Sequence, residues 1–227
     1  MIKYDDFIKH KLRRRVLKTK LITIVFLFAI SASNIFGQNQ TKQSLETSGG
    51  RKFSVSTTYL SFVNFGEEKT NTHHYELHFG YKLTPKDRIG IKLATWKMFA
   101  PMGMPMQEQL KFDENNFYPG RLRESGLGIT YQRMLWKGLF TTIEVLPQLK
   151  TYIDKNDKKI GNGFKLYTSY HLGYHLSMLK DKIYIEPQIH CQYWPIDTNT
   201  PQSFKEQENG WNTYFLFEPN LYVGINF

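Results

Sequence analysis

The sequence predicts an all-β protein, an eight-stranded antiparallel up-and-down transmembrane β-barrel. Three observations predict it. Apolar and polar residues alternate along eight segments, the connections between those segments alternate between short and long, and most charged residues of the segments gather on one of the two faces. Because successive side chains of a strand point to opposite sides, this alternation gives every segment one apolar and one polar face.

The eight segments have about 9 to 13 residues each, long enough to cross a bilayer when tilted by about 45°. In order, they are residues 53–64, 73–83, 89–99, 127–135, 139–151, 164–176, 183–193 and 215–227. In the second segment Tyr75, Leu77 and Phe79 form the apolar face. In the last one the same pattern places Phe215, Phe217 and Pro219 on the apolar face.

The connections support a strand order that runs up and down. Short ones follow Leu83, Leu135 and Leu176, and the last is predicted as a two-residue turn at Leu179 and Lys180. Longer, polar or Gly- and Pro-rich ones occupy residues 65–72, 100–126, 152–163 and 194–214. This pattern is typical of barrels with short periplasmic turns and long external loops.

The polar face decides which side of the sheet faces the lipid. It carries four acids and four bases: Glu76, Lys82, Lys92, Glu144, Lys150, Lys165, Glu186 and Glu218. Such groups can pair inside a narrow polar lumen, whereas a soluble lipocalin-like barrel would turn its apolar face inward. Eight strands leave an interior that side chains just fill, so the lumen is expected to be plugged.

The first 37 residues have the order of a signal peptide: a basic region, an apolar core from Leu21 to Ile30, and small residues before Gly37. We expect residues 1–37 to be a signal peptide, 38–50 a flexible periplasmic tail and 51–227 the barrel. The leader carries +6 of the formal +10, which leaves +4 and little support for nucleic-acid binding. The predicted location is the bacterial cell outer membrane.

The last six residues, 222–227, end in Phe227 and are similar to the carboxy-terminal signal that barrel assembly machinery recognises. Over residues 51–227 the chain resembles a small outer-membrane barrel of the general OmpA and OmpX type. The resemblance is one of architecture. It implies outer-membrane lipid and the assembly machinery as partners, and leaves any extracellular ligand open.

One candidate catalytic cluster lies on the polar faces of two adjacent segments and comprises Ser169, His171, Glu186 and His190. With the two-residue turn, Ser169 would lie opposite His190, and a serine beside a histidine can act as an activated nucleophile. Some outer-membrane barrels modify lipid A, so a lipid A-modifying enzyme is one alternative. The other interpretation is a hydrogen-bonded lumen plug, because buried polar groups must be paired.

A second candidate is the methionine run Met102, Met104 and Met106 in a long loop, whose thioethers could hold a soft ion such as Cu(I). A small-solute or metal-binding barrel is therefore another alternative, although methionines also suit an apolar lid. The favoured interpretation needs no cofactor: a porin-like outer-membrane barrel with a plugged polar lumen and a structural or loop-mediated binding role.

Overall fold

The computed structural model describes residues 50–62, 64, 73–98, 119–209 and 212–227. They form antiparallel strands and two short helices. The elements are β1 (Phe53–Thr58), η1 (Tyr59–Phe62, a 3-10 turn), β2 (Tyr75–Lys82), β3 (Asp87–Met98), β4 (Gly120–Trp136), β5 (Leu139–Asp154), β6 (Lys159–Tyr174), β7 (Leu176–Met178), β8 (Ile183–Thr198), α4 (Gln202–Glu208) and β9 (Tyr214–Asn226).

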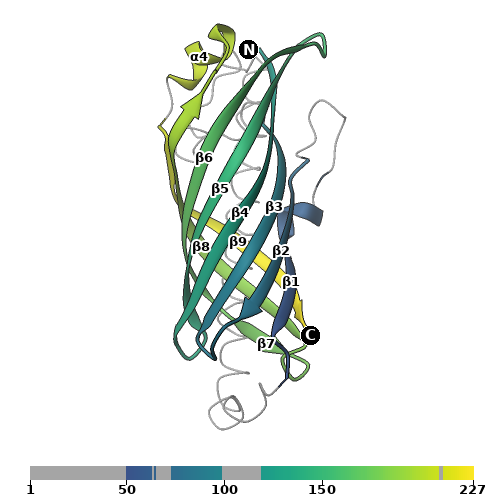
Figure 1. The fold of residues 1–227 in the computed structure, drawn as a ribbon, viewed down its shortest axis with the longest axis vertical. Coiled ribbons are helices and arrows are strands. Elements are labelled where there is room, and N and C mark those ends of the chain that lie inside the picture. The colour runs from purple at the N-terminus through teal and green to yellow at the C-terminus, as the bar shows by residue number, and fades with distance from the viewer. Residues whose placement is uncertain (1–49, 63, 65–72, 99–118, 210–211) are drawn as a thin grey trace, which may run out of the picture. The chain divides into compact units, whose positions relative to one another are not determined.

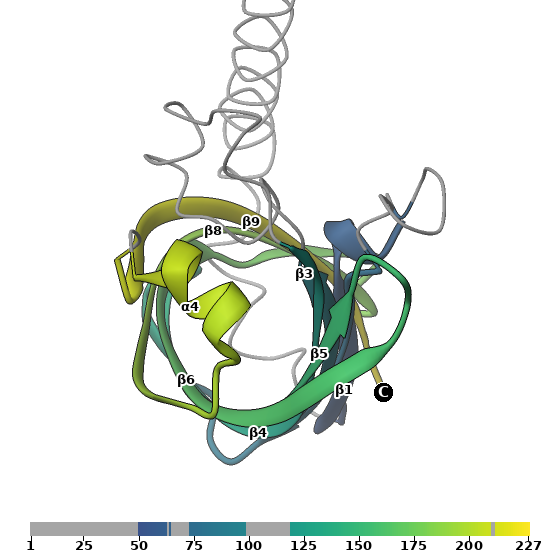
Figure 2. The same cartoon turned by 90° about the horizontal axis from the view of Figure 1, so that it is seen from above.

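The strands form a closed ring. Neighbouring strands pair in chain order from β1 to β6, β6 pairs with β8, β8 with β9, and β9 returns to β1. The short β7 lies along β8 beyond the end of β6, so the described residues give a ring of eight strands (Figures 1 and 2). Phe53 and Phe227 exchange two backbone hydrogen bonds of 3.0 and 2.9 Å at the closure. The all-β antiparallel prediction is confirmed.

The two faces of the wall differ as the alternation predicts. On β4, Leu127 and Ile129 point outward and are 59% and 66% exposed, whereas Glu124 points inward and is 1% exposed. The three tight connections, at residues 83–86, 137–138 and 179–182, lie at the lower end of Figure 1 together with Phe227. The turn between β5 and β6 lies at the upper end, as does α4.

The strands of one side are longer than predicted. β4 has 17 residues, and β5, β6 and β8 have 16 each. The predicted loop 152–163 shrinks to a turn, in which an Asp154 carboxylate oxygen accepts the backbone N–H groups of Asn156 and Lys158 at 2.8 and 2.9 Å. Conversely, β1 ends at Thr58 and the chain continues into η1, so the predicted strand 53–64 was too long.

The start of β9 also differs from the sequence-based expectation. The pairing of β8 with β9 shifts between His190 and Gln192, at a bulge near Phe217, whose φ is +56°. The extra residue turns Phe215 inward, against Trp194 at 5.0 Å between ring centroids, so its predicted place on the outer face was wrong.

The helix α4 lies in a segment predicted as loop. It covers part of the upper opening of the ring (Figure 2), and its Phe204 is fully buried against the Tyr152 ring, with 5.0 Å between centroids. Seven residues are too few for a helix to be stable by itself, so this packing is what holds α4 in place.

Candidate functional site

The inside of the ring carries charged side chains at three levels, which we call the middle, lower and upper layers. The middle layer is built on Lys92 of β3, whose Nζ lies 3.0 Å from Glu76 of β2 and 2.9 Å from Glu144 of β5. All three side chains are at most 3% exposed. A buried charge needs a partner to offset its lost hydration, and here one ammonium group serves two carboxylates.

Glu76 is the most heavily coordinated group of this layer. The hydroxyl of Tyr222 donates to it at 2.6 Å, and the ring nitrogens of His74 and His78 lie at 3.0 and 3.4 Å. Its partners come from β2 and the residue before it, from β3, and from β9 on the far side of β1. The middle layer therefore links strands that are not neighbours in the wall.

The lower layer is centred on Glu186 of β8. His175 Nδ1 lies at 2.8 Å from its carboxylate, Arg88 at 3.4 Å and the Gln132 side-chain amide, as donor, at 3.2 Å. Below it Asp181, in the turn before β8, pairs with Lys82 at 2.9 Å. Burial alone would raise the pKa of Asp181, but hydrogen bonds from His175 and Lys82 hold that pKa well below the ordinary carboxyl range.

The upper layer joins β4, β5, β6 and β8. Lys165 lies 2.5 Å from Glu124, and Lys150 pairs with Asp197. The layer continues into α4 through Thr200, whose hydroxyl donates to Glu208 at 3.2 Å. Burial raises the pKa of Glu208 above that of a free carboxyl.

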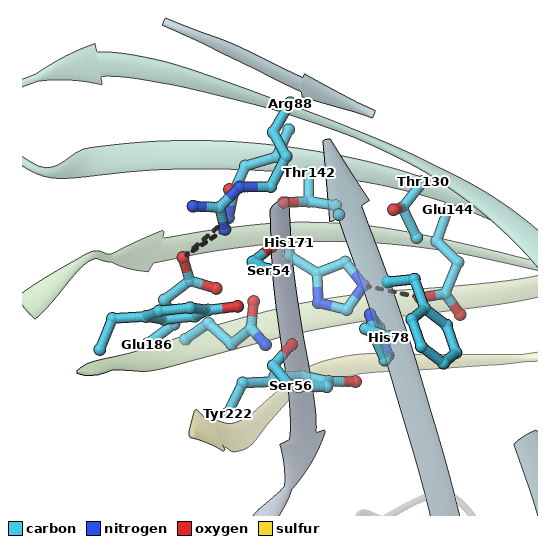
Figure 3. Close-up of a pocket in the computed structure, with 15 residues that line it drawn as sticks. Ser54, Ser56, His78, Arg88, Thr130, Thr142, Glu144, His171, Glu186 and Tyr222 are labelled. Atoms are coloured by element: carbon cyan, nitrogen blue, oxygen red, sulfur yellow. Dashed lines mark hydrogen bonds and ion pairs between the residues drawn. The ribbon is translucent and has the colours of Figure 1, made fainter. Parts of the chain in front are cut away.

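A cavity of about 50 Å³ lies between the middle and lower layers. Figure 3 shows the ring of His171 between the carboxylates of Glu144 and Glu186 in its wall. His171 is buried, its nearer carboxylate is 3.9 Å away, and within the described residues neither ring nitrogen makes a hydrogen bond. A water molecule needs about 10–15 Å³ of such space, so the cavity has room for a few waters at most.

The predicted catalytic cluster is not assembled. The connection after β7 has four residues, Leu179–Lys182, with positive φ at the first three, so the register moves by two residues from the predicted one. Ser169 therefore lies opposite Gln192, and its hydroxyl donates to the Cys191 carbonyl at 3.5 Å. The prediction that it faces His190 was wrong.

The other members of that cluster separate into different contacts. His171 lies opposite His190, with 5.1 Å between ring centroids, and His190 lies 3.4 Å from Glu218. Glu186 belongs to the lower layer with His175. Among the described residues, the Ser169 hydroxyl makes its hydrogen bond to a backbone carbonyl and not to a histidine, so the predicted nucleophile–base contact is not formed.

Residues Met102, Met104 and Met106 lie outside the described residues. In the described part of the chain, no group of three His, Cys, Asp or Glu side chains could hold a metal ion. None of the helices in that same part is long and apolar enough to cross a membrane.

Four charged residues of the layers were missed at the sequence level: Arg88, Glu124, Asp181 and Asp197. Arg88 precedes the predicted start of its strand by one residue, and the other three fall in segments predicted as connections. The missing signal was strand length. Extending the alternation of β4 back to Gly120 places Glu124 on the inner face. The same extension of β8 would place Asp197 outside, and it turns inward because a bulge between Tyr193 and Ile196 shifts the alternation by one residue.

No family model matches the chain, and no curated protein does. Among solved structures, the chain is similar to Ail, the attachment invasion locus protein of Yersinia pestis, in a crystal structure with the heparin analogue sucrose octasulfate. The similarity covers 77% of this chain and 92% of Ail, at 8% sequence identity and a TM-score of 0.35.

Proposed function

We propose that the chain is an integral outer-membrane β-barrel with a plugged polar lumen, which serves as a structural element of the envelope and presents its upper end for binding. The observation that carries this proposal is the inverted distribution of polarity. Large apolar side chains cover the outside of the ring, while the buried inside is charged.

The exposed apolar surface is too extensive for a protein surrounded by water. Thirty large apolar or aromatic side chains are exposed among the described residues, and most belong to the outward face of the strands. Contiguous apolar patches on soluble monomers rarely exceed a few hundred Å². A hydrocarbon surrounding removes this cost, and the pairing of β1 with β9 closes the ring so that the backbone groups of these paired residues are satisfied within the wall.

The height of the apolar band fits a membrane. On the outer face of β4, two arginines, Arg123 and Arg133, flank a run of uncharged side chains: Ser125, Leu127, Ile129 and Tyr131. Ten residues at about 3.3 Å each, tilted by about 40°, give about 25 Å. That is the height of the apolar band of outer-membrane barrels.

The plug follows from the three layers. Each one bridges strands across the ring, the cavity between two of them is only about 50 Å³, and α4 covers part of the upper opening. An eight-stranded ring has room for little more than its own side chains. We therefore expect no steady ion conductance.

The test is a heat-modifiability gel on the outer-membrane fraction, with unboiled protein beside boiled protein. A mobility shift is expected because a closed, hydrogen-bonded ring resists detergent until it is heated. Protein recovered unshifted from the periplasm would overturn the membrane assignment. Steady conductance in planar bilayers would overturn the plug and leave the barrel standing.

Two alternatives are tested separately. The lipid A-modifying enzyme would need a Ser169–His contact, whereas Ser169 lies opposite Gln192, so lipid A is expected to keep its mass after incubation with the purified protein. The metal-binding barrel depends on Met102, Met104 and Met106. It is abandoned if the triple Met→Leu variant binds Cu(I) as the parent does.

A further inference from the structure

The outer face of the ring carries a groove. A groove of about 780 Å³ crosses β2 to β6, lined by Tyr75, Leu77, Leu93, Leu127, Leu149 and Phe164. Two small residues on adjacent strands also line it, Thr95 and Ser125, which are paired in register and joined by a hydroxyl–hydroxyl contact of 3.1 Å. Bulky side chains thus surround these two small ones, which form the bottom of the groove, and the exposed lining is almost wholly apolar.

Positive charge lies directly above this groove. From Ser125 toward the upper end of β4, the next outward side chains are Arg123 and then Arg121. Arg121 pairs with Asp157, whereas Arg123 is exposed and forms no ion pair with any described residue. Three exposed lysines, Lys155, Lys158 and Lys159, lie at the neighbouring turn between β5 and β6.

The lower end of the same strand offers a different environment. Arg133 projects from the same face of β4 but lies 2.7 Å from Asp87, and Tyr131 also donates to Asp87, at 2.6 Å. Both arginines bound the apolar band, and of the two only Arg123 has its charge unmatched by the described residues. An anionic group is therefore favoured at the upper end.

We propose that this surface binds a phosphorylated, multiply acylated lipid of the outer leaflet, with acyl chains in the groove and a phosphate at Arg123. The inference rests on the proposed membrane function, because it needs the groove at hydrocarbon depth and Arg123 at headgroup depth. An apolar groove capped by cations matches the two halves of such a lipid, which buries methylene groups and presents phosphate to basic side chains. The guanidinium group suits a phosphate because it donates two parallel hydrogen bonds.

The experiment measures lipid retained by the full-length barrel in detergent, by native mass spectrometry, with bisphosphorylated lipid A as the probe. Each sample is first checked for a heat-modifiable shift. A sample without the shift reports failure of the membrane proposal, and only shifted samples test lipid binding. Parent protein is expected to retain lipid A at least fivefold better than the same lipid without its phosphates.

Two variants and two matched controls locate the site. Arg123→Gln is expected to weaken retention about fivefold, which is the contribution of one cation near an anionic headgroup, whereas Arg133→Gln leaves it unchanged. Ser125→Phe fills the groove and is expected to reduce retention, whereas Thr141→Phe, a similar enlargement on the outer face of β5 away from the groove, does not.

Three results would overturn the proposal. One is equal retention of phosphorylated and phosphate-free lipid. Another is equal losses for the two arginine variants. The third is displacement of lipid A by millimolar inorganic phosphate, which would indicate a site for the free anion.

Discussion

The inner and outer faces of the same strands obey opposite rules. On β4, Glu124 is buried and ion-paired, while Ile129, five residues along, faces outward and is exposed. In a water-soluble domain the carboxylate would be outside and the isoleucine inside. The comparison teaches that polarity alone does not decide whether a side chain lies inside or outside. The surroundings of each face decide it. Substitutions on one face at a time test this difference.

The largest effect is expected on the inner face, at Lys92. Lys92→Met leaves Glu76 and Glu144 buried without their shared cation, so we expect a loss of about 3–5 kcal/mol in the free energy of unfolding, measured by urea titration in lipid vesicles. The matched control is the triple variant Glu76→Gln, Lys92→Met, Glu144→Gln, which removes all three charges and should recover most of that loss. A single variant as stable as the parent would contradict the pairing.

The next effect is expected on the outer face, at Ile129. Ile129→Lys places a charge near the middle of the apolar band and should cost about 2–4 kcal/mol in vesicles. Ile160→Lys, also exposed but close to the upper turn, should cost about 0–1 kcal/mol. If the ring stood in water, both changes would stay within about 0.5 kcal/mol, and the contrast between depths would vanish.

The smallest effect is expected at Asp181, a partly exposed residue below the lower layer, in the turn before β8. Since its folded-state pKa is depressed, its stabilising contribution is complete above the unfolded value of about 4 and disappears as the pH falls through the lower folded pKa. Asp181→Asn should therefore be about 1 kcal/mol less stable than the parent at a constant margin from pH 7 to 5, a margin that narrows below pH 4. Thermal unfolding followed by circular dichroism measures it. A margin that widened in acid would reverse the assigned sign.

The fold was predictable because alternation is a local property. Tyr75, Leu77 and Phe79 face outward and Glu76 and His78 inward as expected, since side-chain direction depends only on strand geometry. The partners of the inner charges were less predictable. Whether Ser169 meets His190 or Gln192 depends on the length of one turn, and two residues in that turn changed every cross-strand pair along it.

The long strands and α4 were missed for a related reason. The strand signal weakens before residues 152–154, and Pro195 interrupts residues 194–198. Both segments continue as strand where Lys150 of β5 and Lys165 of β6 pair with Asp197 of β8. Phe204 anchors α4 against Tyr152, and a single aromatic residue in a polar segment carries no periodic signal. Tertiary contacts decided both outcomes.

The closure between β1 and β9 also constrains the order in which the protein can assemble. The first strand pairs with residues 222–226, and Phe53 pairs with Phe227, so contacts between residues 164 to 174 positions apart in the chain must form before the ring exists. Pairings of such long sequence separation form slowly, and an open sheet exposes both its edges meanwhile. The strand β9 must therefore be present before the ring can close, and until then the chain depends on being kept from pairing with other chains.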